Sequence, residues 1–125
     1  MNILIIDDMA DARALVRAYL AADEHVRVVE APDAKTGLNY LAREAFDVVL
    51  LDIRMPDFEG LSLLDVMKKA PGPGKPRFVM VSAVSSESVV RDALDRGAHE
   101  YLQKPFSKQQ LRDRLLAWQE AAKTG

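Results

Sequence analysis

Polar residues of three chemical kinds follow the apolar runs of this sequence, in the order Asp7, Asp8, Asp52, Ser82 and Lys104. Three carboxylates brought together would repel one another strongly unless a cation lies among them. Ligands that offer only oxygen favour a hard ion, which indicates Mg²⁺, with Mn²⁺ as a substitute. A metal ion, an ammonium and a hydroxyl around one carboxylate suit phosphoryl transfer to that carboxylate, here Asp52.

Each of these residues also has a plain structural interpretation. An aspartate that follows a strand, such as Asp8, is often a helix N-cap. Ser82 by itself is more often a turn residue, and Lys104, which precedes Pro105, is more often a solvated lysine. The functional interpretation therefore depends on whether the chain brings all five residues to one edge of one sheet.

Short apolar runs predict the strands that would carry these residues. Three of the four strong runs are nearly unbroken, which is typical of strands buried on both faces of a parallel sheet, whereas Arg27 interrupts the second. A weaker fifth run surrounds Tyr101 and Leu102. The four strong runs are Ile3–Ile6, Val26–Val29, Val48–Leu51 and Phe78–Val81.

Helical periodicity lies between these runs and after the last of them, with recognisable start and stop residues. Asp33 is a predicted N-cap, Ser85–Ser86 are cap residues before a fourth helix, and Gly97 is its predicted C′ residue. Ser107–Gln110 form a capping-box pattern at the start of the last helix. We interpret Pro71–Pro76 as a loop before the fourth strand.

The resulting order of elements is βαβαβαβαβα, which predicts an α/β fold with a parallel sheet and helices on both faces. With strand order 2-1-3-4-5, the first, third and fourth strands are neighbours. Ligands of such sheets bind beyond the carboxyl ends of the strands, where the strand order reverses. Asp7, Asp8, Asp52 and Ser82 would then share one crevice, and Lys104 would reach in from the edge.

Length, charge and composition argue against several other classes of function. The 125 residues fit one domain, with about residues 2–122 in its structured core, and the net charge of −2 gives no footprint for nucleic acid. The sequence has no cysteine and two histidines, so thiolate or zinc sites are not expected. No apolar run reaches the ~20 residues of a membrane helix, and the start lacks the features of a signal peptide. We therefore expect a cytoplasmic protein.

The motifs at these strand ends resemble the receiver domain of bacterial two-component response regulators, the CheY-like superfamily. The resemblance rests on ILIIDD, DVVLLDIRMPDFEG, VMVSA and GAHEYLQKPF, at Ile3–Asp8, Asp47–Gly60, Val79–Ala83 and Gly97–Phe106. Its most specific part is D-x-x-M-P-x-x-x-G from Asp52, with K-P-F downstream. It covers nearly the whole chain and implies a doubly wound (βα)5 flavodoxin-like fold forming a single receiver domain, residues 1–125.

The resemblance implies one role for each matching position in the acidic site. Asp52 resembles the phosphoacceptor. Asp7 and Asp8 resemble the acidic pair that holds Mg²⁺ together with Asp52, one of the pair through water. The backbone carbonyl of Arg54 resembles the third protein ligand of the metal.

The resemblance also implies a switch. Ser82 matches the hydroxyl that bonds the phosphoryl group, and Lys104 matches the lysine that pairs with it and precedes a cis bond to Pro105. Tyr101 matches the aromatic residue that turns inward when the hydroxyl moves. Phosphorylation then changes the surface of the fourth helix, fifth strand and fifth helix.

The implied partners are a sensor histidine kinase or a histidine phosphotransfer protein as donor, and a downstream output protein or domain. Acetyl phosphate is a second plausible donor. The family resemblance implies that the chain is not an enzyme but a phosphoacceptor that assists its own phosphotransfer and dephosphorylation. No nucleic-acid or membrane contact is expected, and a phosphorylation-linked homodimer is compatible with the sequence.

Two individual positions bear on the lifetime of the phosphoryl group. Arg54 places a long cation at the mouth of the site. It is either a solvated side chain or one paired with a local acid, or it hinders or orients the attacking water. Val84, two residues after Ser82, is apolar and cannot hydrogen-bond that water. Together they predict a fairly long-lived phosphoryl group.

Three other classes of function fit the sequence less well. A pseudo-receiver, which keeps the fold as an interaction module without phosphorylation, typically lacks one of the acidic residues or the lysine, and here all are present. Phosphatases and mutases of the aspartyl-phosphate type resemble D-x-D-x-T/V after the first strand, which this chain lacks. An FMN-binding flavodoxin would need a Ser/Thr-rich phosphate loop where Asp7 and Asp8 stand.

Overall fold

The computed structural model describes the backbone of residues 1–52, 54–55, 58–70, 72–83 and 87–124. Five parallel strands form one sheet in the order β2-β1-β3-β6-β7. The strands are β1 (Asn2–Ile6), β2 (Arg27–Ala31), β3 (Val48–Asp52), β6 (Arg77–Ser82) and β7 (Glu100–Gln103). This order confirms the predicted 2-1-3-4-5 topology, with β6 and β7 as its fourth and fifth strands.

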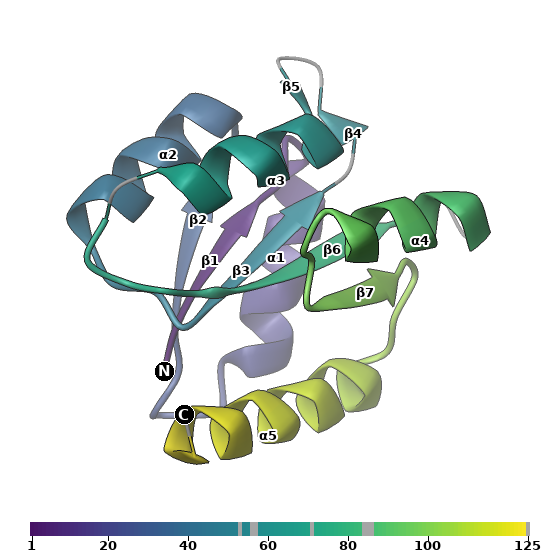
Figure 1. Ribbon diagram of the computed structural model, residues 1–125. Coiled ribbons are helices and arrows are strands. Elements are labelled where there is room, and N and C mark those ends of the chain that lie inside the picture. Colours follow the sequence, from purple (N-terminus) through teal and green to yellow (C-terminus); the bar gives the residue numbers. More distant parts are fainter. Residues whose placement is uncertain (53, 56–57, 71, 84–86, 125) are drawn as a thin grey trace.

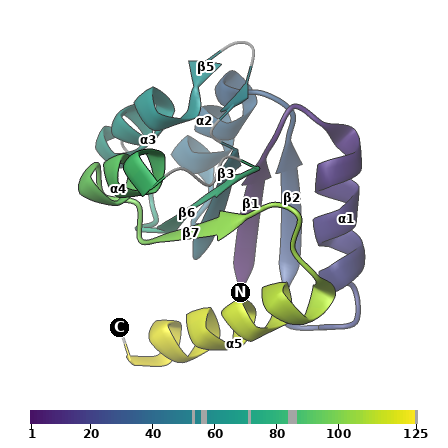
Figure 2. The ribbon, with the colours of Figure 1, turned by 90° about the vertical axis from the view of Figure 1, so that its right-hand side faces the viewer.

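Five helices cover the two faces of the sheet (Figure 1). They are α1 (Ala10–Leu20), α2 (Ala34–Arg43), α3 (Gly60–Lys69), α4 (Glu87–Asp95) and α5 (Lys108–Thr124). Helices α2, α3 and α4 lie on one face, whereas α1 and α5 lie on the other (Figure 2). Among the described residues, none of the helices combines the length and the apolar character that a bilayer-spanning segment requires.

The alternation of side chains along each strand divides the core into two clusters, one on each face. Leu4 and Ile6 of β1 pack with α2, α3 and α4, together with residues such as Leu63 and Met67. Ile3 and Ile5 pack with α1 and α5, together with residues such as Val16, Leu115 and Trp118. The edge strand β2 is less buried than β3, which explains why Arg27 is tolerated there.

A short antiparallel pair, β4 (Arg54–Met55) and β5 (Phe58–Glu59), was not predicted. It follows β3 directly and leads into α3. Strands of two residues are too short to show the period-two alternation by which strands are found in a sequence.

The predicted helix ends are confirmed where the structure describes them. The Asp33 side chain accepts a hydrogen bond from the Thr36 amide at 2.7 Å. Gly97 has a φ of 101°, the left-handed conformation that favours glycine after a helix. The Ser85–Ser86 cap residues, and Pro71 of the predicted loop, lie outside the described residues.

The capping box at α5 gives a prediction for stability. The Gln110 amide donates to Ser107 Oγ at 3.0 Å, and the Ser107 amide donates to Gln110 Oε1 at 2.8 Å. Replacement of Ser107 by alanine is expected to lower the free energy of unfolding by about 1 kcal/mol, since it removes one acceptor for the first helical turn. Urea denaturation measures this. Ser107→Thr, which keeps the hydroxyl, should retain most of the stability, and an equal loss in both variants would contradict the capping role.

His99 gives a prediction for pH dependence. Its Nδ1 accepts the Phe78 amide at 3.1 Å, and its own amide donates to the Phe78 carbonyl at 2.8 Å. Burial lowers the pKa of His99, and the charges of Arg77 and Lys68 lower it further. The folded protein therefore binds the His99 proton less readily than the unfolded chain does.

The contribution of His99 to stability is thus present above its unfolded pKa of about 6.5 and is lost as pH falls through its folded pKa. We expect the free energy of unfolding to fall between pH 7.5 and pH 5 by more in the wild type than in His99→Asn. The asparagine oxygen can replace Nδ1 as acceptor but does not titrate in this range. Parallel urea titrations at the two pH values measure the difference, and identical pH slopes in the two proteins would contradict it.

Candidate functional site

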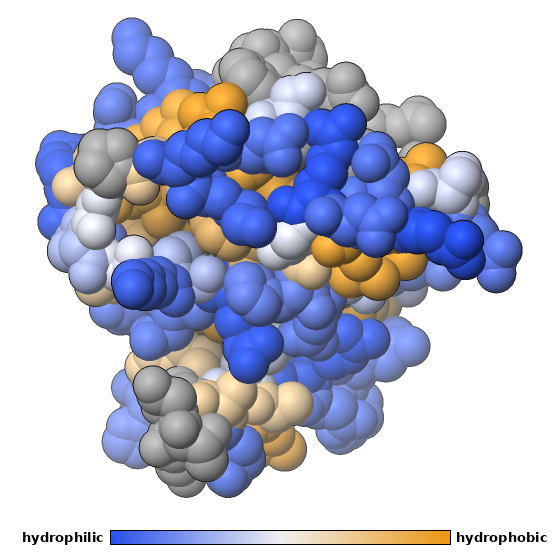
Figure 3. All heavy atoms as spheres, in the orientation of Figure 1, coloured by the Kyte–Doolittle hydropathy of each residue, from blue (hydrophilic) through white to orange (hydrophobic). Residues whose placement is uncertain are grey.

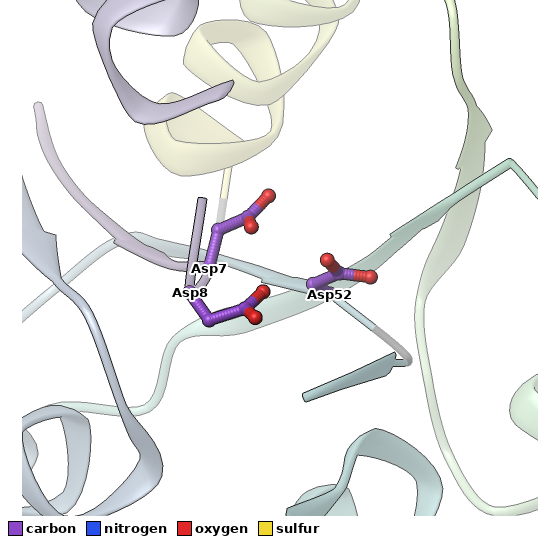
Figure 4. Close-up of side chains that lie close together, drawn as sticks. All are labelled: Asp7, Asp8 and Asp52. Carbon is purple, nitrogen blue, oxygen red and sulfur yellow. The ribbon is translucent and has the colours of Figure 1, made fainter. Parts of the chain in front are cut away.

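The carboxyl edge of the sheet brings three carboxylates together (Figure 4). Asp7 and Asp8 follow β1, and Asp52 ends the neighbouring strand β3. One carboxylate oxygen from each of the three lies within 4.8 Å of the others. Asp7 and Asp52 are buried, with exposed fractions of 2% and 8%, whereas Asp8 is exposed to solvent. The three carboxylates form a cluster of oxygen ligands, exposed to solvent at Asp8, which can hold a divalent cation.

The ammonium of Lys104 is a positive charge that lies against these carboxylates. Its Nζ donates to Asp7 Oδ2 at 2.8 Å and lies 3.5 Å from Asp52 Oδ2. Burial lowers the pKa of Lys104, but the hydrogen bond to Asp7 and the charge of Asp52 outweigh it and raise that pKa above its ordinary value. Lys104 is therefore held charged between two buried carboxylates.

The position of Lys104 is fixed by the end of β7. Its amide donates to the Ser82 carbonyl at 2.8 Å, one step beyond the register pair Ser82 and Gln103. The peptide bond between Lys104 and Pro105 is cis, as the sequence resemblance implied. The lysine thus leaves the sheet on the side where β1 and β3 end.

The sequence analysis assigned Ser82 and Tyr101 to a switch, and the structure places them on the neighbouring strands β6 and β7. Ser82 is buried at the end of β6, one residue beyond Val81, which pairs with Asp52. Tyr101 lies on β7 and packs against the core cluster shared by α2, α3 and α4. The hydroxyl therefore stands at the acidic edge, and the aromatic ring stands on the face that carries α4.

Two positions used in the sequence analysis are described only in part or not at all. Arg54 belongs to β4, two residues after Asp52, and its side chain is outside the described part of the structure. Val84 lies outside the described residues altogether. The predicted lifetime of a phosphoryl group, which rests on these two residues, stays a prediction.

An apolar cavity of about 350 Å³ opens beside the carboxylates, and the sequence did not indicate it. Asp7, Asp52 and Lys104 form its polar side. The other walls come from α1, the sheet and the segment after β7, with Leu15, Val16, Val81, Pro105 and Phe106 among them. Hydrocarbon side chains therefore line the space beside the acidic site.

Arg13 on α1 also contacts this edge, and nothing in the sequence indicated it. Its Nη1 donates to the backbone carbonyl of Asp7 at 2.6 Å. An arginine six residues after Asp7 gives no recognisable pattern, because the contact depends on how α1 packs beside β1.

Comparison with known proteins identifies the family of this chain. The family model described as "Response regulator receiver domain" matches residues 3–116. The chain belongs to this family. In this receiver domain, the three carboxylates and Lys104 lie together at the carboxyl edge of the sheet, and their roles in phosphoryl transfer stay predictions.

Curated relatives and solved structures extend the match. Chemotaxis protein CheY of Bacillus subtilis is 31% identical over 105 residues, which are 84% of this chain and 86% of that protein. A CheY-like response regulator receiver domain protein from Methanospirillum hungatei has a TM-score of 0.84 at 30% identity, and the match covers 99% of this chain and 98% of that one. The CheX-CheY-BeF3-Mg+2 complex from Borrelia burgdorferi matches with a TM-score of 0.81 at 25% identity, over 94% and 87% of the two chains.

Some relatives are much longer. A protein-glutamate methylesterase/protein-glutamine glutaminase of Sulfurimonas denitrificans is 36% identical over 111 residues, which are 86% of this chain but 30% of that protein. The chain thus spans about a third of the length of such relatives. Receiver domains occur both nearly alone, as in CheY, and joined to enzymatic domains.

Proposed function

We propose that this receiver domain is a phosphorylation-activated switch whose phosphoacceptor is Asp52. The observation that carries the proposal is the convergence of three carboxylate oxygens within 4.8 Å of one another, with the Lys104 ammonium against two of the carboxylates. Two of the three carboxylates are buried, so the negative charge gathered at this edge favours the binding of a cation. Family membership supports phosphorylation-based switching as the general function.

Mg²⁺ is the cation that this ligand set fits best. Asp7, Asp8 and Asp52 offer only carboxylate oxygens, and the backbone carbonyl of Arg54 would add another oxygen. The bound metal would neutralise charge on the transferring phosphoryl group, and Mn²⁺ could substitute for it. The solved complex of CheY with Mg²⁺ and BeF3 supports this choice for a protein of the same fold.

The transfer itself is a displacement at phosphorus. A carboxylate oxygen of Asp52 forms the new bond to phosphorus, and the bond between phosphorus and the leaving group of the donor breaks. The electron pair of that bond stays with the leaving group, which is the imidazole nitrogen of a phosphohistidine donor. Lys104 stabilises the negative charge that now extends beyond Asp52.

Ser82 and Tyr101 would carry the change outward. The phosphoryl oxygens on Asp52 would accept hydrogen bonds from Ser82 and Lys104, which draws both toward the edge. Tyr101 would then turn inward, and the α4–β7–α5 surface would shift to its active form. In Figure 3 the visible face is largely hydrophilic, with an apolar area in the region of α4, where Leu94 is 45% exposed.

The partners that this function requires are a phosphodonor and a recipient of the signal. The donor is a sensor histidine kinase or a histidine phosphotransfer protein, and acetyl phosphate can replace it in vitro. The recipient is a separate output protein or a further domain, and pairing of two α4–β7–α5 surfaces would give a phosphorylation-linked homodimer. Nucleic acid and membrane are not among the proposed partners, and residues 1–125 act as one receiver unit.

Intact mass measurement tests the proposal. Incubation of the protein with acetyl phosphate and Mg²⁺ is expected to give one phosphoryl adduct, which disappears when EDTA replaces Mg²⁺. If acetyl phosphate gives no adduct, a panel of phosphohistidine donors repeats the test. Failure with every donor would overturn the proposal in favour of a pseudo-receiver that acts through protein interaction alone.

A further inference from the structure

The side chain of Arg13 links the acidic edge to the neighbouring edge strand. Its Nη1 donates to the Asp7 carbonyl at 2.6 Å, and its Nε donates to Glu30 Oε1 at 3.1 Å. The side chain is 15% exposed, which is low for an arginine on a surface helix. None of the roles proposed above uses this residue.

The contact with Asp7 fixes the backbone from which both metal-binding side chains start. The Asp7 amide donates to the Ala31 carbonyl of β2 at 3.1 Å, so the peptide unit before Asp7 is held by the sheet. The Asp7 carbonyl belongs to the next peptide unit, whose nitrogen is that of Asp8, and the planarity of the peptide bond makes this unit rigid. Arg13 is therefore placed to hold the peptide plane between Asp7 and Asp8.

Glu30 in turn holds Arg13. Glu30 lies on β2, which is the strand next to α1 in Figure 2. Its second oxygen, Oε2, lies 2.9 Å from the Nε of Arg17. A planar guanidinium presents several N–H groups in fixed directions, so Arg13 can hold a carboxylate and a carbonyl at the same time. The chain of contacts from β2 to Glu30, Arg13 and Asp7 does not need the metal.

We propose that Arg13, anchored by Glu30, is a positioning residue for the metal-binding carboxylates of Asp7 and Asp8. The inference rests on the proposed function, because it assigns Arg13 to the same metal site. Residues that orient metal ligands without touching the metal commonly change metal affinity by 10–100-fold when they are replaced.

Arg13 also carries a positive charge, which by itself opposes the binding of a cation. Removal of the charge would strengthen Mg²⁺ binding, whereas loss of the two hydrogen bonds would weaken it. Arg13→Lys separates these effects, because lysine keeps the charge but cannot hold the carbonyl and the carboxylate in one planar fork. This variant is therefore the appropriate test.

Arg17 provides a matched control on the same helix. It is an arginine that pairs with the same glutamate, and its Nη1 donates to the Val28 carbonyl at 3.2 Å rather than to Asp7. Arg17→Lys therefore makes the same chemical change one helical turn away, without touching the peptide unit between Asp7 and Asp8.

Isothermal titration of the full chain with Mg²⁺ measures the effect, and urea unfolding in EDTA measures stability without metal. Arg13→Lys is expected to bind Mg²⁺ about tenfold more weakly than the wild type, and Arg17→Lys is expected to bind it within about twofold of the wild type. Equal Mg²⁺ affinity in Arg13→Lys and the wild type would overturn the inference, even if the variant is less stable. Equal losses in both lysine variants would also overturn it.

Glu30→Gln provides a second variant in case Arg13→Lys does not fold in EDTA. It weakens the anchor of Arg13, and it should lower Mg²⁺ affinity in the same direction. Unchanged affinity in this variant would overturn the role of the anchor. A wild type that binds no Mg²⁺ at millimolar concentration would overturn the proposed metal site as well, whereas normal wild-type binding with unchanged variants would overturn the role of Arg13 alone.

Discussion

Replacement of Asp52 by asparagine is expected to abolish the phosphoryl adduct that acetyl phosphate and Mg²⁺ produce in the wild type. A neutral amide is a poor nucleophile, and the substitution also removes the negative charge of one of the three carboxylates at the acidic edge. Intact mass spectra of both proteins over the same time course measure this. The expected result is a background level of adduct in Asp52→Asn.

Asp47→Asn is the matched control for this experiment. Asp47 precedes β3 at the opposite end of the strand, where its Oδ2 accepts the Asn2 amide at 2.7 Å. This variant should form the adduct as the wild type does. Adduct at the wild-type level in Asp52→Asn would place the phosphoacceptor elsewhere.

The stability of Asp52→Asn distinguishes loss of chemistry from loss of fold. Without metal, the wild type holds three carboxylates against the single ammonium described at this edge, that of Lys104. Removal of one negative charge relieves repulsion, so the variant should be at least as stable in EDTA as the wild type. Urea denaturation measures this. If Asp52→Asn is strongly destabilised, the absence of the adduct is explained by unfolding and not by loss of the phosphoacceptor.

Replacement of Lys104 by methionine is expected to slow adduct formation by about 100- to 1,000-fold, the effect of removing one group that stabilises charge in a transition state. Methionine keeps most of the length of the side chain but leaves Asp7 and Asp52 without the cation that now lies 2.8 Å and 3.5 Å from them. The time course of adduct formation by intact mass measures the rate. Lys108→Met, at the exposed start of α5, should react at the wild-type rate.

The same variant should also lose about 1–2 kcal/mol of stability in EDTA, because two buried carboxylates lose the ammonium that lies beside them. The loss is at the lower end for a buried ion pair because the Lys104 side chain is 25% exposed. Added Mg²⁺ should restore part of the stability, since it supplies a cation to the same carboxylates. If Lys104→Met has the stability of the wild type and forms the adduct at the wild-type rate, the proposed role of Lys104 at this site is wrong.

The sequence by itself predicted the fold because the signals that define it are local. Unbroken apolar runs identified β1, β3 and β6, and the edge strand β2 was recognised despite Arg27, which its exposed position permits. Cap residues such as Asp33 and Ser107 predicted helix starts that the structure confirms. Alternation of strands and helices then left few topologies, and the order β2-β1-β3-β6-β7 is the one expected.

The convergence of the acidic residues was also predictable from the sequence. Residues that follow neighbouring parallel strands must meet at one edge of the sheet, whatever their side chains do there. Asp7, Asp8 and Asp52 therefore had to come close once the strand order was known. Their roles in catalysis and metal binding remain proposals that the mutants above test.

The tertiary structure alone decided which side chains touch. Lys104 lies closer to Asp7 than to Asp52. Neither the spacing of these residues in the sequence nor the family motif could predict which carboxylate is nearer. The contact of Arg13 with the Asp7 carbonyl, the apolar cavity beside Asp52 and the β4–β5 pair were likewise not predicted. Periodicity and caps depend on residues that are near one another in the chain, whereas contacts such as Lys104 with Asp7, 97 residues apart, depend on strand register, helix packing and side-chain rotamers together.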